Sequence, residues 1–261
     1  MEKRKDLIFL TNDDGFNAEG LKRLIKIAKT NSSNVLTVAP ENNQSGKSHS
    51  LTINKFLKIK KINKNFYVFK GSPVDCVILG LKQFAFNSKK PKLLLSGINI
   101  GANMGQDLHY SGTFAGAREG MLNGVPSVAI SIQKNGKDIN WKLPNFYMPK
   151  IINNILKNNL CKDNLININF PNLPIQDIAG IKVTRLGKRK PGIIIQKKNI
   201  RNMTYLKIPS ERAQHYSAKP GEDEYELNKG FITLTFHSAQ NITLNQKNPK
   251  EYDLIKSKIF E

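Results

Sequence analysis

Two adjacent carboxylates near the amino terminus, Asp13 and Asp14, stand in a setting that favours metal chemistry. They follow Leu7 to Leu10, a short apolar run of the length expected for a strand buried on both faces of a parallel sheet. In open α/β sheets, ligands bind just beyond the carboxyl ends of the strands. Carboxylate oxygens suit Mg²⁺, Mn²⁺ or Ca²⁺. Because Asn, Asp and Gly also favour turns, an ordinary turn over residues 12–15 is the alternative interpretation.

Further polar groups follow the next expected strands of the sheet. Val35 to Ala39 leads into a polar loop that contains Ser45. Lys92 to Leu95 leads into a glycine-rich segment that contains Asn99 and Asn103, where the backbone is expected to approach a ligand closely. If these strands are parallel, their carboxyl ends meet at one edge of the sheet, where a hydroxyl and an amide join the two carboxylates. This oxygen-only set matches one divalent cation, whereas no cluster of Cys and His favours zinc.

A Ser-Gly-Thr turn, Ser111 to Thr113, opens an expected helix that runs to about Asn123. Its hydroxyls and the free backbone N–H groups of a helix amino terminus form a natural anion site. A plain N-cap by Ser111 or Thr113 is compatible with the same residues. The turn therefore predicts a phosphate contact next to the metal site without excluding a purely structural role.

The alternation of strands and helices from Asp6 to Phe170 predicts a Rossmann-like three-layer α/β/α fold with a mostly parallel sheet. From Gly180 the pattern changes to strand-like segments separated by basic or Gly/Pro turns. We therefore expect a single domain over 1–261, with an α/β core at about 1–178. A β-rich oligomerisation arm, built as a C-terminal β-hairpin, is expected at about 179–240, and a short terminal helix at about 249–260.

The composition of the chain limits the cellular compartment and the binding partners that can be expected. No stretch of the sequence is long and apolar enough for a transmembrane helix, and no signal peptide is recognised before the first strand. Cys76 and Cys161 lie far apart in the sequence and are expected to be buried thiols. We therefore expect a cytoplasmic protein without membrane contact. The formal net charge of +21 is compatible with a nucleic-acid, membrane or polyanionic partner. Since the lysines are spread along the chain, compositional drift with some attraction of phosphate is the preferred explanation, and no specific nucleic acid is expected.

The chain contains several short motifs, and their order along the sequence identifies a family more specifically than any one motif alone. They are Thr11 to Gly15, Ala39-Pro40 with Ser45 to Thr52, Gly71 to Val77, Ser96 to Gly105 and Tyr110 to Thr113. Through these motifs, spread over more than half of the chain, the sequence resembles the SurE family of survival-protein nucleotidases. The resemblance implies a metal-dependent phosphomonoesterase, a 5′-nucleotidase, that acts on nucleoside monophosphates. It leaves open 3′-monophosphates and short polyphosphate as further substrates.

The resemblance also implies roles for individual residues. Asp13, Asp14 and Asn99 are the implied catalytic residues. The implied metal ligands are Asp13, Asp14, Ser45 and Asn99, and the ion is one Mg²⁺ or Mn²⁺ per subunit, with Ca²⁺ as a substitute in crystals. The expected contacts to the substrate phosphate are Ser45, Gly46, Asn103, Ser111, Gly112 and Thr113. His49 is close to these in sequence, but a surface histidine without a role is the preferred interpretation.

Two other functions are compatible with parts of the sequence. A phospho-receiver or aspartyl-phosphate enzyme also uses an Asp at the first strand end, but no Asp-x-Asp arrangement is present here. A nucleic-acid-binding or phosphate-recognising protein without turnover is the other alternative, and only the charge supports it.

Strand-like residues of the arm have no evident helix layer to cover them: Ile193, Ile194, Ile195, Tyr205, Phe231 and Phe236. We therefore expect a homodimer or tetramer assembled through the arm.

Overall fold

The computed structural model describes residues 4–86, 90–136, 138–161, 164–188, 192–193, 195–201, 203–208, 212–213, 217–238, 253 and 256–259. The strands are β1 (Ile8–Thr11), β2 (Val35–Pro40), β3 (Ile59–Asn63), β4 (Phe66–Phe69), β5 (Leu93–Ile100), β6 (Ser127–Ile132), β7 (Leu165–Phe170), β8 (Gly180–Val183), β9 (Gly192–Ile193), β10 (Gln196–Ile200), β11 (Met203–Lys207), β12 (Arg212–Ala213) and β13 (Phe231–His237). The α-helices are α1 (Glu19–Asn31), α2 (Pro73–Gly80), α3 (Gly112–Leu122), α4 (Lys142–Asn158) and α5 (Asp223–Asn228). A π-helical turn, η1 (Leu81–Ala85), and two 3₁₀ turns, η2 (Gly105–His109) and η3 (Ile175–Asp177), complete the elements.

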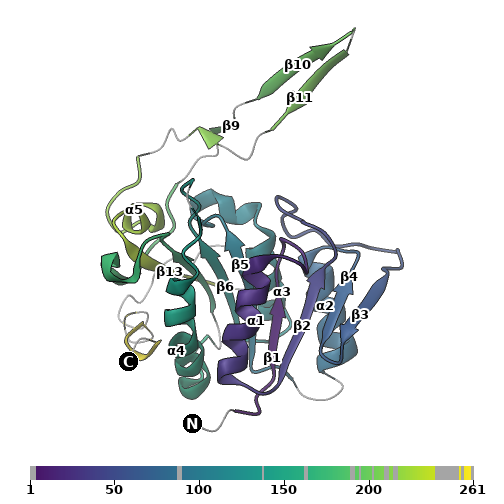
Figure 1. Ribbon diagram of the computed structural model, residues 1–261, viewed down its shortest axis with the longest axis vertical. Coiled ribbons are helices and arrows are strands. Elements are labelled where there is room, and N and C mark those ends of the chain that lie inside the picture. Colours follow the sequence, from purple (N-terminus) through teal and green to yellow (C-terminus); the bar gives the residue numbers. More distant parts are fainter. Residues whose placement is uncertain are drawn as a thin grey trace.

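A nine-stranded sheet forms the centre of the molecule, in the order β3-β4-β2-β1-β5-β6-β7-β13-β8 (Figure 1). β4, β2, β1, β5, β6 and β7 are parallel, so their carboxyl ends share one edge. From β1 the chain moves outward to β2 and β4, and from β5 it moves in the opposite direction to β6 and β7. The strand order therefore reverses between β1 and β5, which is where open α/β sheets bind their ligands.

The sheet is covered on both faces, which confirms the predicted three-layer fold. Ile8 and Leu10 of β1 pack in one hydrophobic core with residues of α1 and α4. Leu7 and Phe9 point to the opposite face and pack with residues of α2 and α3. Because successive side chains of a strand alternate between faces, a continuous apolar run is what a strand buried on both sides requires.

The two helices on the second face begin at well-formed caps. Ser72 caps α2 and forms a capping box with Asp75, whose side chain accepts the N–H of Ser72 at 2.8 Å. Ser111 caps α3, because its hydroxyl accepts the N–H of Phe114 at 3.0 Å. The helix start predicted at Ser111 is confirmed, and Asp75 stabilises the start of α2 as an acidic residue in a first turn does.

The region from Gly180 is divided between the main sheet and a hairpin. β13 pairs antiparallel with β7 and parallel with β8, so Phe236 lies in the main core at 7% exposure. The expectation that the segment around Phe231 and Phe236 needs a partner to cover it is therefore wrong, since β7 offers an open edge. β10 and β11 do form a separate hairpin, exposed along its whole length, that extends away from the sheet (Figure 1).

Other expectations concern the cysteines, the terminal helix and the membrane. Cys76 and Cys161 are buried and carry free thiols. Residues 253 and 256–259 are helical, and Ile259 is fully buried in the core beside α4, whereas the rest of 249–260 and Ile194 lie outside the described residues. In the described part of the chain, no helix has the length and apolarity needed to cross a membrane.

Candidate active site

The turn after β1 brings the two carboxylates to the edge of the sheet. The side-chain amide of Asn12 donates to the carbonyl of Gly15 at 2.9 Å and closes the turn. Gly15 has a φ of +97°, a conformation that favours glycine. The N–H of Gln44 donates to the backbone carbonyl of Asp13 at 2.7 Å. The turn is therefore tied to the loop after β2, and the polar turn interpreted from the sequence also serves to position Asp13.

Asp13 lies directly against the amino terminus of α3. Its carboxylate accepts a hydrogen bond from the hydroxyl of Thr113 and from the backbone N–H groups of Gly112 and Thr113. A Cβ on Gly112 would lie 2.7 Å from the Cβ of Asp13, so a side chain here would displace the carboxylate. Burial raises the pKa of Asp13, although these hydrogen bonds act in the opposite direction. The helix terminus predicted as an anion site thus holds an anion of the chain itself.

Asp14 connects the same turn to the end of β5. It is partly buried and accepts a backbone N–H from Ile100, the residue after Asn99. Burial and the neighbouring Asp13 carboxylate raise the pKa of Asp14 to about 6. The side-chain nitrogen of Asn99 donates to the carbonyl of Gly101 at 2.7 Å. Asp13, Asp14 and Asn99 therefore lie at the carboxyl ends of the two strands that flank the reversal of strand order.

The loop after β2 is held over the amino terminus of α3. Ser48 donates through its backbone N–H to the carbonyl of Tyr110 at 3.1 Å, and through its hydroxyl to the carbonyl of His109 at 2.6 Å. Ser45 and Gly46 are exposed at the tip of the loop, and Gly46 has a φ of +73°. Ser45 follows Gln44, which binds Asp13, so the loop brings Ser45 to the same edge. A role for Ser45 as a ligand remains a prediction.

Asn103 belongs to a buried network of asparagines, in addition to any contact with a substrate. Its side-chain nitrogen donates to Ser131 at 2.8 Å, and its backbone N–H donates to Asn169 at 2.8 Å. Its carbonyl accepts from Asn167 at 3.0 Å and from Asn169 at 2.9 Å. The side-chain amide of Asn103 is therefore bound by β6 and its backbone by β7. Because the amide nitrogen carries a second N–H, the predicted contact to phosphate does not require the bond to Ser131 to break.

Sequence reasoning missed the residues that hold this glycine-rich segment. Asn167 and Asn169 are fully buried on β7. In the sequence they stand two residues apart in an otherwise apolar strand, and this pattern could have indicated a buried polar contact. Asp223 is also fully buried, and its carboxylate accepts the N–H of Gly105 at 2.9 Å and of Gly187 at 3.0 Å. Burial raises the pKa of Asp223, while these hydrogen bonds lower it. The sequence feature that could have indicated Asp223 is the unusually acidic stretch that follows Gly221.

His49 is not a lone surface histidine, contrary to the preferred interpretation of the sequence. Its Nε2 lies 2.8 Å from a carboxylate oxygen of Glu119, and its side chain is only 28% exposed. The second Glu119 oxygen accepts from the side chain of Asn123 at 2.8 Å. The sequence could not reveal this contact, because it depends on how the loop folds back onto α3.

The residues at this edge fit a divalent cation. Asp13 and Asp14 are adjacent carboxylates whose mutual repulsion and burial a dication would offset. Among the described residues, no group of three or more His, Cys, Asp or Glu has a geometry that could hold a metal ion. The predicted ligands Ser45 and Asn99 would add a hydroxyl and an amide oxygen, which are donors of the kind that Mg²⁺ and Mn²⁺ take.

Comparisons with known proteins show the family to which the chain belongs. The family model described as survival protein SurE matches residues 8–192, well over half of the chain. The chain belongs to the SurE family. A protein named 5′-nucleotidase SurE from Paramagnetospirillum magneticum is 41% identical over 230 residues, which cover 87% of this chain and 88% of that protein. A protein of the same name from Nitrobacter winogradskyi is 41% identical over 211 residues, which cover 79% of this chain and 82% of its own.

A solved structure of a SurE family member shows the same fold. The crystal structure of the SurE protein from Aquifex aeolicus superimposes with a TM-score of 0.78 at 35% sequence identity. The match covers 96% of this chain and 97% of that chain, so it includes the region after Gly180. The family expectation drawn from the short motifs is therefore confirmed in both sequence and fold.

Proposed function

We propose that this SurE family protein is a metal-dependent phosphomonoesterase that hydrolyses nucleoside 5′-monophosphates to nucleoside and phosphate. The observation that carries the proposal is the meeting of Asp13 and Asp14 with Asn99 and the amino terminus of α3 at the reversal of strand order. Relatives of about 40% identity over most of the chain are named 5′-nucleotidase SurE, which supports the same reaction.

The proposed metal ligands are Asp13, Asp14, Ser45 and Asn99, around one Mg²⁺ or Mn²⁺. When bound, such an ion polarises the phosphoryl group and lowers the pKa of a bound water. Asp13 is held in place by the helix terminus and Thr113, so its role is to anchor the ion. The oxygens of Asp14 accept fewer hydrogen bonds, which leaves this carboxylate better placed to orient the attacking water or accept its proton.

The phosphoryl group would be bound by the loops that surround the carboxylates. We assign its oxygens to the exposed tip at Ser45 and Gly46, where charge builds during the reaction. Ser111, Gly112 and Thr113 are kept as predicted contacts, and a phosphate there would share the Thr113 hydroxyl and the N–H groups of Gly112 and Thr113 with the carboxylate of Asp13. Asn103 is included as a further contact, through the second N–H of its side-chain amide.

A metal-by-substrate screen on purified protein tests this function. Metal-stripped protein is assayed for phosphate release from 5′- and 3′-monophosphates and from short polyphosphate, with Mg²⁺, Mn²⁺, Ca²⁺ or Zn²⁺ restored one at a time. We expect release from 5′-monophosphates with Mg²⁺ or Mn²⁺ and loss of activity with a chelator. Full activity of the stripped protein would contradict metal dependence. Salt-sensitive binding of nucleic acid without any turnover would favour the rival function as a binding module.

Assembly and compartment complete the proposal. The hairpin of β10 and β11 exposes large apolar side chains, with Leu206 at 66% and Met203 at 60% exposure. Since an isolated hairpin is marginal in water, we propose that it packs against a second copy in a homodimer or tetramer. Free buried thiols at Cys76 and Cys161 are compatible with the cytoplasm as the compartment.

A further inference from the structure

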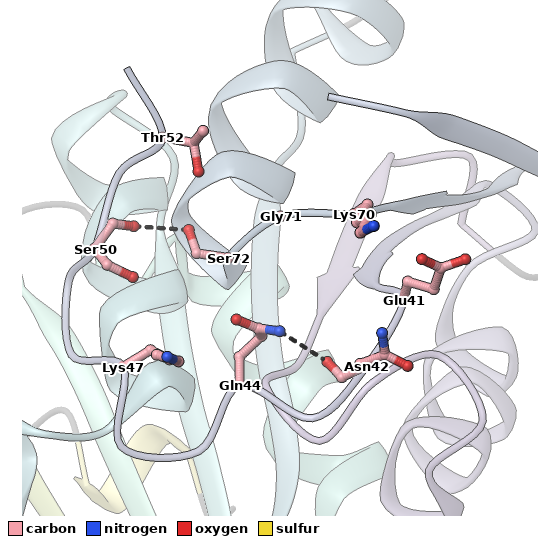
Figure 2. Close-up of a pocket in the computed structure, with 9 residues that line it drawn as sticks. All are labelled: Glu41, Asn42, Gln44, Lys47, Ser50, Thr52, Lys70, Gly71 and Ser72. Atoms are coloured by element: carbon pink, nitrogen blue, oxygen red, sulfur yellow. Dashed lines mark hydrogen bonds between the residues drawn. The ribbon is translucent and has the colours of Figure 1, made fainter. Parts of the chain in front are cut away.

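A polar pocket opens beside the candidate active site, between the loop after β2 and the turn that precedes α2. It encloses about 410 Å³. Figure 2 shows Lys47 on one side of the pocket, Lys70 and Glu41 on the other, and Gln44 and Asn42 between them. None of the roles assigned above to the active site uses this pocket.

The pocket carries two unpaired ammonium groups. Neither Lys47 nor Lys70 forms an ion pair with another described residue, and Glu41 is also without one. Two of the three hydroxyls of the wall are already engaged, since Ser72 donates to the carbonyl of Ser50 at 2.7 Å and Thr52 donates to Asp75 at 2.8 Å. The side chains available to a ligand therefore carry a net positive charge, which favours an anionic group.

The pocket and the active site share a wall. Gln44 lines the pocket, while its backbone N–H donates to the carbonyl of Asp13 at 2.7 Å. Asn42 also lines the pocket, and its backbone would lie 3.2 Å from a Cβ placed on Gly15. The pocket lies over the ends of β2 and β4, which follow β1 in the sheet. At roughly 4.8 Å per strand, its far side is about 10 Å from the end of β1. The pocket thus extends from about 5 Å to about 10 Å from the end of β1, a range that includes the spacing of the two phosphates across one nucleoside.

We propose that this pocket is a subsite for a second phosphoryl group of the substrate. With the scissile phosphate at the carboxylates, the nucleoside would extend along the shared wall, and a second phosphate would lie between Lys47 and Lys70. The substrate class is a nucleotide with a further phosphate, such as a nucleoside 3′,5′-bisphosphate or a 5′-phosphorylated dinucleotide. Glu41 opposes this binding in part, so its charge sets how strongly the second phosphate is preferred. The inference rests on the proposed nucleotidase function.

Selectivity between substrates tests the subsite. We define the selectivity as kcat/KM for adenosine 3′,5′-bisphosphate divided by kcat/KM for adenosine 5′-monophosphate. The double variant Lys47→Gln, Lys70→Gln is expected to lower this ratio about tenfold, because each ammonium–phosphate contact adds a few-fold. Glu41→Gln is expected to raise it about twofold. The matched control is Lys26→Gln, Lys29→Gln on α1, two exposed lysines that lie outside the pocket, and its ratio should be unchanged.

Each outcome decides the inference. An equal loss of kcat/KM for both substrates, or an unchanged ratio in the pocket variant, would overturn it, because the lysines would then act only through overall charge. The same ratios measured with the 5′-phosphorylated dinucleotide show which of the two substrates the subsite accepts. If no nucleotide is hydrolysed, the proposed function fails, and calorimetry of the two adenosine nucleotides replaces kinetics. Tighter binding of the bisphosphate that the pocket variant loses would then support the subsite, and equal binding would overturn it.

Discussion

The hydroxyl of Thr113 donates a hydrogen bond to the carboxylate of Asp13, a residue 100 positions earlier in the chain. The contact joins the first strand end to the amino terminus of α3, where two backbone N–H groups bind the same carboxylate. A buried carboxylate is stable only when its charge is satisfied in this way. The orientation of the proposed metal anchor therefore depends on α3 as well as on its own strand.

Replacing Thr113 tests this dependence. Thr113→Val keeps the shape of the side chain but removes the donor, so Asp13 loses a charge-assisted hydrogen bond worth about 2 kcal/mol of folding free energy. We expect kcat to fall at least about tenfold, because the anchor is no longer held in one orientation. Thr113→Ser, which keeps the hydroxyl, is the control. Urea unfolding and phosphate release give the two quantities, and wild-type turnover in the valine variant would contradict this role.

The buried carboxylate of Asp223 is expected to hold the glycine-rich segment from outside the site. Asp223→Ala removes the acceptor of the Gly105 and Gly187 N–H groups and leaves both donors buried. We expect a loss of about 2–4 kcal/mol of unfolding free energy and a lower kcat/KM. Asp177→Ala, at an exposed acidic residue of η3, is the matched control and should change either quantity little. Equal stability of the two variants would show that Asp223 has no such role.

Metal affinity is expected to depend on pH in a direction set by Asp14. Because the pKa of Asp14 is raised to about 6, its carboxylate is increasingly protonated below that pH. A ligand must lose its proton before it binds a metal, so the apparent affinity for Mn²⁺ should fall by up to about tenfold per unit below pH 6. In metal-free protein, the raised pKa makes folding less favourable as the pH increases from 3.8 through about 6. Calorimetric titrations at pH 5, 6 and 7.5 measure the affinity, and equal values would exclude this linkage.

The exposed hairpin provides a test of assembly that leaves the main sheet intact. Deletion of a segment as long as 188–229 would also remove α5, whose Asp223 and Leu227 are buried. Replacing residues 195–208 by two glycines removes only the hairpin and its short connections. We expect the full-length protein to be at least a dimer by light scattering at micromolar concentration, and the shortened protein to be a smaller species. A monomeric full-length protein would refute the assembly, and an unchanged oligomer would place the interface elsewhere.

The sequence was sufficient to predict the core elements of the fold and the edge at which the site residues gather. The apolar run at Leu7 to Leu10 and the turn at Ser111 are local signals, and each corresponds to the expected element. The convergence of Asp13, Asp14 and Asn99 follows from parallel strands, whose carboxyl ends must share an edge. These predictions succeeded because they depend on residues close in sequence and on one topological rule.

Features that depend on distant pairing were missed. β13 could be assigned to the main sheet only by knowing that β7 has a free edge, and nothing in Phe231 to Phe236 specifies its partner. Two further contacts, His49 with Glu119 and Asp223 with Gly105, likewise join segments that are far apart in the chain. Buried polar residues require partners, so the acidic stretch after Gly221 indicated such contacts but could not name them.

The most direct test of the account is hydrolysis of adenosine 5′-monophosphate by metal-stripped protein, titrated with Mn²⁺, for the wild type and Asp14→Asn. The substitution keeps the size of the side chain and removes one of the two carboxylate charges at the site. We expect the wild type to regain activity with about one Mn²⁺ per chain. We expect the variant to retain the circular dichroism spectrum of the wild type, with kcat lower by a factor of roughly a hundred or more. A folded Asp14→Asn protein with near wild-type turnover, or full wild-type activity without added metal, would contradict it.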